Sequence, residues 1–445
     1  SCRIFDGTTN LTTGSNSIST VSQTGTFLLD SPLTIPKGSV KTLNAVCNIT
    51  SSATSSSVVR AGLALPSTGL AVTGLTSGNT VSASGSATLG QIMTVQAGSL
   101  VVSLDSSSPA IALAASQAQG VTMGIFKLRA TNDAVNLSKF GLTLATSTIN
   151  DISTVTLWAN NVQVGSGFFT ALTQQITLNS PLLLPKDTDV LLTLRANVPA
   201  IGTSQPGTPG QLVAVAWNNN AVNNQFTGVG SGSDIVGTGT ATSTGVRIFK
   251  SIPVVARLPL TSTNNLVNGT QDLFRFSVKA DAAGSVSLAK ITATSTGTGV
   301  TYTAATVKVV AYTDSSFGST IGGGFTNGEV FTGGSVVSSQ DLDLLFSAPV
   351  VIPANTTYYF KIVSDIGGVD AAGDSISTKL MGDASPTYSM VRTVTVADAD
   401  AEDDFIWSGN TLGDSAAVTA DWFNGFQVVG LPSSNTDAST NTRAN

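Results

Sequence analysis

The chain has 445 residues, of which 41% are hydrophobic and only 10% are charged, and its formal net charge is −6. A chain of this length is expected to form roughly two to four domains. The sequence has no basic, aromatic-rich face that could neutralise phosphates, which excludes a nucleic-acid partner. Because charges are scarce, the polar surface must be built largely from Ser, Thr, Asn and Gly.

The chain contains no histidine. This excludes Ser-His-Asp and Cys-His catalysis and metal sites with histidine ligands, so we expect that the protein is not an enzyme. A glycoside hydrolase needs only two carboxylates, but no pair of acids has a suggestive spacing. Of the 26 acidic residues only Glu329 and Glu402 are glutamate. Glutamate favours helices and aspartate favours turns, so helix is expected to be scarce.

The opening stretch, SCRIFDGTTN, has the pattern of a β-strand and begins with Ser1 instead of methionine. We take this as a sign of processing or of a fragment. Further along, the apolar runs are short, such as QLVAVAW from Gln211 and DLLFSAPVVIP from Asp343. They are well below the ~20 residues that cross a bilayer, so no membrane span is expected.

One sequence block occurs three times without gaps, starting at Pro32, Pro181 and Pro349. Each copy has a proline, three mostly apolar residues, a second proline, a polar turn and then alternating apolar residues. Alternation with period two predicts a half-buried antiparallel strand, and proline favours a strand entry or an edge. The alternating positions are Leu43, Ala45, Cys47 and Ile49; Leu192, Leu194, Ala196 and Val198; and Phe360, Ile362, Ser364 and Ile366. A second strand is predicted just upstream, at Phe27/Leu29, Ile176/Leu178 and Leu344/Phe346.

A second block occurs twice, as GIFKLRATNDAVNLSKFGLTL from Gly124 and LFRFSVKADAAGSVSLAKITAT from Leu273. Together the blocks predict an all-β chain of tandem immunoglobulin-like sandwiches. The expected parts are a partial sandwich (1–98), a full sandwich (99–247), a full sandwich with a C-terminal aromatic hairpin (248–432) and a polar tail (433–445). We expect the modules to be arranged as beads on a string.

The first module is expected to be incomplete. We place Cys2 level with Val155 of the second module. The strands before that point in the second module, about residues 101–154, then have no counterpart in the first. Half a sandwich exposes apolar faces and unpaired strand edges, so this module should not be stable alone.

Several stretches carry a family resemblance: FKLRATND, LPKDTDVLLTLRANVPAIGTSQPGTPGQLVAV, VRIFKSIPVVA, DFIWSGN and DWFNGFQVVGLPSS. With them, most of residues 100–435 resembles large tandem Ig-like-repeat surface proteins predicted from genomes of the candidate phyla radiation (Patescibacteria). The resemblance implies a cell-surface location and tandem Ig-like modules, usually preceded by further modules. It implies no activity and no site residues.

The two cysteines, Cys2 and Cys47, are predicted to point inward, because their counterparts Val155 and Ala196 share the parity of core residues. A disulfide across the sandwich is one interpretation and a free buried pair is the other. A disulfide implies an oxidising, extracellular setting.

Two further surface features are candidates for ligands. An acidic cluster could hold calcium at a module edge, or could be a solvated acidic loop: Asp398, Asp400, Glu402, Asp403 and Asp404. Possible glycans are indicated by sequons, which a chain rich in Asn, Ser and Thr also acquires by chance: Asn10, Asn48, Asn136, Asn268 and Asn355.

Aromatic residues gather near the C-terminus, at Trp407, Trp422, Phe423 and Phe426. They form either a hairpin that covers the core of the third module or a surface that docks on a neighbouring subunit. Both interpretations stay open at this point.

The sequence therefore predicts a secreted structural protein that assembles with copies of itself into a surface filament or surface layer. Strands of a neighbouring chain would complete the first module by β-strand addition. The predicted acceptor residues are Ile4, Phe27 and Leu29, and the predicted docking or donor residues are Trp407, Trp422, Phe423, Phe426, Val428 and Leu431. The alternative is an adhesin or a carbohydrate-binding stalk.

Overall fold

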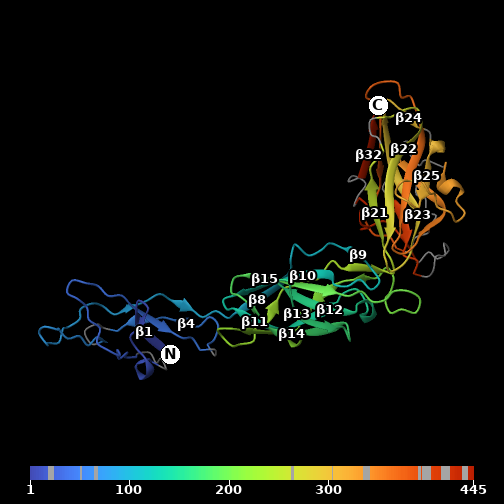
Figure 1. Ribbon diagram of the computed structural model, residues 1–445. Coiled ribbons are helices and arrows are strands. Elements are labelled where there is room, and N and C mark those ends of the chain that lie inside the picture. Colours follow the sequence, from blue (N-terminus) through green and yellow to red (C-terminus); the bar gives the residue numbers. More distant parts are fainter. Residues whose placement is uncertain are drawn as a thin grey trace.

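The computed structural model shows an almost entirely β-stranded chain in three successive parts (Figure 1). It describes residues 1–18, 25–50, 53–64, 69–261, 265–302, 304–333, 341–388, 392, 402–411, 421–432 and 439–444. Helical structure in these residues is confined to short turns such as Ile149–Asp151. The predicted all-β fold class of immunoglobulin-like sandwiches is confirmed.

The second part of the chain is a sandwich. Its first sheet has the order β8-β10-β15-β12-β13, formed by Ser99–Leu104, Val121–Thr131, Asp189–Ala196, Thr154–Ala159 and Val162–Phe168. Its second sheet is built around β11 (Val135–Leu144), which pairs with β14 (Thr173–Leu184), β17 (Val215–Trp217) and β18 (Gln225–Gly228). At one edge the two sheets are joined, because Gly165 of β13 pairs with Leu178 of β14. One hydrophobic core lies between them and runs from Leu100 to Ile248.

Smaller strands complete this part of the chain. β20 (Val246–Phe249) pairs with β16 (Leu212–Val213) and runs parallel to β9 (Ala112–Ala115). β19 (Gly237–Thr238) pairs in parallel with β8 at the edge of the first sheet.

The third part repeats this plan. Its first sheet has the order β21-β22-β28-β25-β26, with β24 on β28, formed by Pro253–Leu258, Gly269–Ala280, Thr357–Gly367, Lys308–Tyr312, Glu329–Thr332 and Thr301–Tyr302. Its second sheet is built around β23 (Val286–Thr298), which pairs with β27 (Asp341–Ile352), β29 (Ser375–Leu380) and β30 (Phe405–Ser408). β31 (Trp422–Phe423) continues this sheet beyond β30.

The C-terminal residues correct one prediction. Residues 433–445 are predicted to be a polar tail, but β32 (Ser439–Ala444) pairs antiparallel with β29 along its whole length. The backbone of a polar segment can extend an open sheet edge whatever its side chains, since main-chain groups make the bonds. Hydrophobic alternation could not reveal this strand.

The repeated blocks fall on equivalent strands of the two sandwiches. The proline block covers the end of β14 and all of β15 in the second part, and the end of β27 and most of β28 in the third. Pro185 and Pro353 directly follow β14 and β27, where a residue without an N–H ends a ladder,. On β15 the burial alternates as predicted, with Leu192 fully buried and Leu191 42% exposed.

The first part of the chain has only a sparse network of strands. One sheet has the order β2-β1-β3, from Thr9–Asn10, Cys2–Asp6 and Leu43–Cys47. Two short ladders join β4 (Val58–Val59) to β7 (Met93–Thr94) and β5 (Gly62–Leu63) to β6 (Thr88–Leu89). Among the described residues up to Gly98, the only buried hydrophobic side chain is that of Cys2.

Two predictions for this part are wrong. Phe27 and Leu29 lie outside any strand, and β3 is exposed instead of half-buried, with Leu43 43% exposed. The physical reason is the same in both cases. No second sheet faces β3 in the described residues, so the alternating apolar side chains have nothing to pack against.

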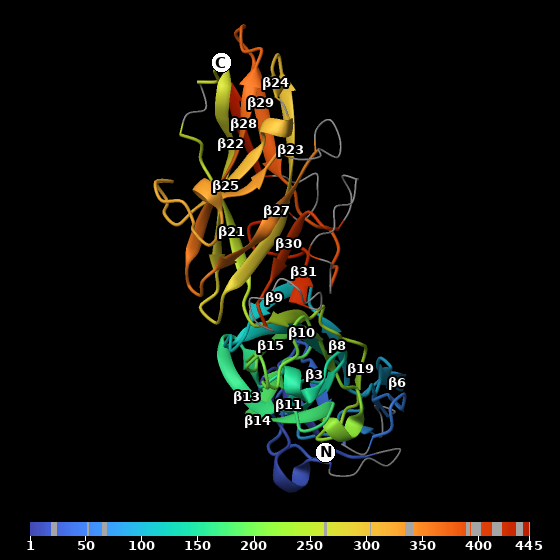
Figure 2. The same cartoon turned by 90° about the vertical axis from the view of Figure 1, so that its right-hand side faces the viewer.

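The second and third parts share a packed junction (Figure 2). The ring of Phe249, at the end of β20, lies 4.9 Å from that of Trp407 and 4.7 Å from that of Phe423. Arg247 stacks over Tyr388 at 3.6 Å, and Lys250 Nζ donates to the Asn410 carbonyl at 2.8 Å. The expected beads-on-a-string arrangement is therefore wrong for these two modules, because residues of both form one core.

The alternation on β15 makes a stability prediction. Replacing Leu192 by alanine should lower the free energy of unfolding of the second module by about 2–5 kcal/mol, because it leaves a cavity in a closed core. Replacing its neighbour Leu191 should change it by no more than about 0.5 kcal/mol. Urea unfolding followed by the fluorescence of the buried Trp217 checks this. Equal effects of the two substitutions would contradict the assigned faces of β15.

Candidate functional site

The free edge of β3 is the first candidate site. In the second part, the equivalent strand β15 has a neighbour on each side, β10 and β12. In the first part, β3 pairs with β1, the counterpart of β12, and no described strand takes the place of β10. One row of backbone N–H and C=O groups on β3 is therefore unpaired within the described residues, which is what a sheet needs in order to accept another strand.

The apolar side chains of this part of the chain are uncovered. Leu43 is 43% exposed, whereas its counterpart Leu192 is fully buried. Other large apolar residues share this exposure: Leu28, Ile35, Val40, Val46, Ile49, Val58, Leu63, Leu70, Val72, Leu75, Val81, Leu89, Ile92 and Met93. Apolar side chains left exposed in such number are typical of a segment that another chain covers.

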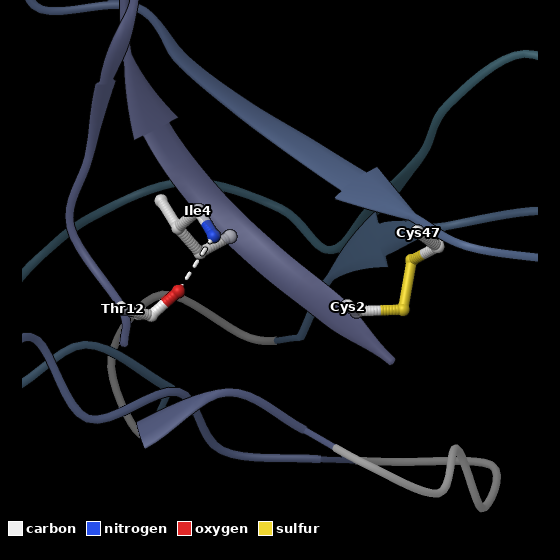
Figure 3. Close-up of a disulfide and its surroundings, with 4 residues drawn as sticks. All are labelled: Cys2, Ile4, Thr12 and Cys47. Carbon is white, nitrogen blue, oxygen red and sulfur yellow. Dashed lines mark hydrogen bonds between the residues drawn. A yellow bond between two sulfur atoms is a disulfide. The ribbon is translucent and has the colours of Figure 1, made fainter. Parts of the chain in front are cut away.

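Of the three predicted acceptor residues, only Ile4 lies in a strand. Ile4 lies in β1, half-buried, and its backbone N–H donates to Thr12 Oγ1 at 2.9 Å (Figure 3). Phe27 and Leu29 are half-buried in an irregular segment. Ile4 thus belongs to the uncovered sheet itself, while the other two lie outside its strands.

The two cysteines are joined by a disulfide that holds this sheet together (Figure 3). Cys2 on β1 and Cys47 on β3 are direct cross-strand partners, just as their counterparts Val155 and Ala196 are. The sequence predicts a disulfide across the sandwich. The structure shows that it links neighbouring strands of one sheet instead. The register explains this, because it places the two residues opposite each other on the same face.

The C-terminal aromatic residues are not a docking surface. Trp407, Trp422, Phe423 and Val428 are each 3% exposed or less. Trp407, Phe423 and Val428 belong to the third module's main core, and Trp422 packs with Ala289 and Ile406. The prediction that these residues dock on another subunit is wrong, since they already cover their own module and the preceding Phe249.

The remaining two predicted docking residues, Phe426 and Leu431, are half-buried. Leu431 packs against the main core of the third module. Neither residue lies in a strand. Using their segment as a donor strand would also pull Trp422 and Phe423 out of the core.

The predicted calcium ligands are scattered. Asp398 and Asp400 lie outside the described residues. Glu402 accepts a hydrogen bond from the Ser385 N–H at 2.8 Å, while Asp403 and Asp404 are buried. A solvated acidic loop is therefore the wrong description of Asp403 and Asp404, and no group of three or more possible ligands occurs in the described residues. The calcium site stays a prediction.

Asp403 instead belongs to a buried ionic centre, which sequence reasoning missed. Lys290 Nζ lies 2.7 Å from Asp343 Oδ1 and 2.7 Å from Asp403 Oδ2. The lysine is 1% exposed, and the two aspartates are 8% and 4% exposed. The sequence contains two features that could have indicated this centre. Lys290 is the only charged residue in the apolar stretch VSLAKITA, and the apolar stretch DLDLLF has two aspartates among its first three residues.

Two further buried carboxyls lie beside this centre. Burial raises the pKa of Asp404 to about 8, helped by the nearby Asp383 carboxyl, and burial raises the pKa of Asp383 to about 7. The backbone N–H groups of Asp404 and Gly425 donate to Asp383 at 3.0 and 2.7 Å. Burial also raises the pKa of Asp343, against the opposing effect of Lys290.

No protein-family model and no curated protein matches the chain. Solved structures give weak likenesses. The C-terminal domain of the Streptococcus agalactiae AgI/II polypeptide BspA is 12% identical, with 63% of this chain and 95% of that chain covered and a TM-score of 0.16. The T6 backbone pilin of Streptococcus pyogenes is 8% identical, with 71% and 64% covered and a TM-score of 0.19.

A third likeness is to a structure described as manganese lipoxygenase of Gaeumannomyces graminis and partial zonadhesin of Komagataella pastoris. It is 10% identical, covers 64% of this chain and 88% of that chain, and has a TM-score of 0.16. TM-scores this low transfer no function to this chain. Separately, none of the helices in the described ranges combines the length and the apolarity that crossing a lipid bilayer requires.

The disulfide makes a prediction for the first part of the chain. Replacing Cys47 by serine removes a cross-link between residues 45 positions apart. In the chain-entropy model such a cross-link lowers the entropy of the unfolded chain and so stabilises the folded state by about 4 kcal/mol. Limited proteolysis should therefore cut residues 1–98 faster in the variant and leave the other modules intact. Thiol titration of the denatured, unreduced protein should find no free thiol, and two free thiols would contradict the pairing.

The raised carboxyl pKa values make a prediction about pH. Asp383 and Asp404 keep protons in the folded chain that they lose near pH 4 when unfolded, so the folded state binds more protons between these limits,. Stability is then greatest below pH 4 for these two groups and falls as pH rises toward 7 to 8, by about 1.4 kcal/mol per pH unit for each protonated group.

Urea unfolding of the third module at pH 5 and pH 8 measures this effect, with Trp407 and Trp422 as probes after Trp158 and Trp217 are changed to phenylalanine. The chain has no histidine to titrate in this range,. Asp404→Asn, which resembles the neutral acid, should weaken the dependence and leave only the part that is due to Asp383. A module that becomes more stable from pH 5 to pH 8 would show that the assigned shifts are wrong.

Proposed function

We propose that the protein is an extracellular structural subunit that assembles with copies of itself into a surface filament or surface layer. In this assembly, strands of a neighbouring copy cover the apolar face of β1 and β3 and pair with the free edge of β3. The single observation that carries the proposal is the contrast between Leu43, 43% exposed, and its fully buried counterpart Leu192.

The chemistry of strand addition supports this assignment. Main-chain hydrogen bonds to the β3 edge supply affinity, and alternating side chains that fill the uncovered face supply specificity. The added strand takes the place that β10 has beside β15, where Phe126 and Leu128 face the core. Contacts of this head-to-tail kind join one surface of a copy to a different surface of the next and so propagate into open polymers.

The donor differs from the one that the sequence predicts. Trp407, Trp422, Phe423 and Val428 are committed to the core of their own chain, so the donor is a different segment of the neighbouring copy. The junction around Phe249 supports a structural role, because side chains of the second and third modules pack together there.

Three properties support an extracellular structural role. The disulfide between Cys2 and Cys47 fits an oxidising compartment,. The low charge content, with 10% charged residues, permits close contact between uncharged polar surfaces. The sequence resemblance to tandem-repeat surface proteins agrees with a cell-surface location.

An adhesin or carbohydrate-binding stalk is the second candidate. It is favoured by a hollow of about 310 Å³ on the second module, whose lining includes the amide side chains of Gln175, Asn219 and Gln225 beside apolar residues such as Phe226 and Ile235. Amide side chains of this kind can hydrogen-bond sugar hydroxyls. The concave aromatic cluster that such a role would favour is not formed by Trp407, Trp422 and Phe423, which are buried.

Opposite faces of β3 provide the test of assembly. Leu43→Asp places a charge on the face that the donor covers, and Val46→Asp places one on the other face of the same strand, where Val46 is 50% exposed,. We expect the wild-type chain and Val46→Asp to form filaments or sheets in negative-stain microscopy and large species in sedimentation velocity. Leu43→Asp should stay monomeric, because burying a lone charge is costly.

A wild-type chain that stays an elongated monomer at every concentration would favour the stalk instead. Assembly of Leu43→Asp to the same extent as the wild type would refute the proposed acceptor face.

A further inference from the structure

Lys290 occupies an unusual position in the third module. It lies in β23, the central strand of its sheet, where it is paired with Leu345 of β27 on one side and Ile406 of β30 on the other. Asp343 lies two residues before Leu345 on β27, and Asp403 lies just before β30. The two neighbouring strands thus each deliver one carboxylate to the same amine, at 2.7 Å.

As a purely ionic structure, this arrangement has a large unfavourable desolvation free energy. A lysine that is 1% exposed and two aspartates that are less than one-tenth exposed have all lost their hydration, and desolvation of buried ion pairs commonly outweighs their attraction. Only the Asp403 contact has hydrogen-bond geometry, whereas both carboxylate oxygens of Asp343 lack a hydrogen-bond partner in the described part of the chain.

We propose that Lys290 and Asp343 form an intramolecular isopeptide bond and that Asp403 transfers the protons. The product replaces a buried amine and a buried carboxyl by one neutral amide, which removes the desolvation cost of both. The bond ties β23 to β27 covalently and closes the chain between them, which includes β25 and β26.

The proton and electron balance closes without any further reagent. Lys290 starts as an ammonium, Asp403 as a carboxylate and Asp343 as the neutral acid. Asp403 takes one proton from Nζ, and the nitrogen lone pair attacks Cγ of Asp343 to form the new C–N bond. Asp403 then protonates the hydroxyl of Asp343, the C–O bond breaks and water leaves. A final proton from the nitrogen returns to Asp403, which ends neutral.

The roles of the two aspartates follow from their contacts. The proton carrier must be hydrogen-bonded to the amine, and Asp403 Oδ2 accepts from Lys290 Nζ at 2.7 Å. The electrophile must be the protonated acid, since a carboxylate repels a nucleophile. Burial raises the pKa of Asp343 although Lys290 Nζ, 2.7 Å from Asp343 Oδ1, acts in the opposite direction. Neither oxygen of Asp343 has a partner with hydrogen-bond geometry in the described part of the chain.

The second module contains a natural control. Lys139 on β11 is the counterpart of Lys290 in the aligned blocks, and Gln175 pairs with Gly141 just as Asp343 pairs with Thr292. Lys139 takes part in none of the salt bridges between described residues. The same lysine position without the two acids should remain an ordinary amine.

Mass spectrometry of the intact, reduced full chain tests the proposal. The wild-type mass should be lower than the sequence mass by one water molecule. Protease digestion should release one branched fragment in which Nζ of Lys290 is bonded to the side chain of Asp343. A full sequence mass would overturn the proposal, and a branch at Asp403 would overturn the assigned roles.

Three variants sharpen the result. Lys290→Arg keeps a cation for both aspartates but has no nucleophilic amine, so its mass should equal its sequence mass. Lys139→Arg should still lack one water molecule. Asp403→Ala should have its full sequence mass, because without the proton carrier the amide does not form. A mass one water molecule below the sequence mass in Lys290→Arg would contradict the assignment, and so would a full sequence mass in Lys139→Arg. Both results can be read whether or not Asp403→Ala folds.

Discussion

An apolar strand face is stable only when a second sheet covers it, and this constraint organises the whole chain. The second and third modules satisfy it within themselves, with continuous cores between their two sheets. The first part does not, although its sequence repeats the same block. Leu43 and Leu192 have the same place in that block, yet one is 43% exposed and the other is fully buried. The difference lies in what covers the strand, and this is why the proposed function is assembly.

Covalent and aromatic contacts reinforce the chain where simple sandwich packing is weakest. The Cys2–Cys47 disulfide joins the two longer strands of the coreless part. Phe249 packs against Trp407 and Phe423 and so fixes the junction between two modules that would otherwise hinge. The proposed Lys290–Asp343 bond would add a third such link, inside the sheet that carries the C-terminal segments. A subunit that transmits force along a polymer benefits from all three.

Much of the fold could be predicted from the sequence, because repeated blocks with period-two alternation specify strands and their faces. Leu192 and Leu194 lie where the pattern places them. The aromatic residues Trp407 and Phe423 could not be assigned from the pattern, since a core residue and a docking residue have the same composition, and only the packing around Phe249 separates them. The Lys290 centre depends on contacts with Asp343, 53 positions away, and Asp403, 113 positions away, which no local pattern contains.

Hydrogen exchange of the β3 backbone tests the central claim most directly. In an antiparallel strand, alternate N–H groups face opposite neighbours, so one set on Leu43–Cys47 bonds to β1 and the other set faces the free edge. The free-edge amides should exchange quickly in dilute monomer and become strongly protected in the assembled polymer, while amides of β15 should be protected in both. Free-edge amides that exchange equally fast in both states would show that no strand is added at β3.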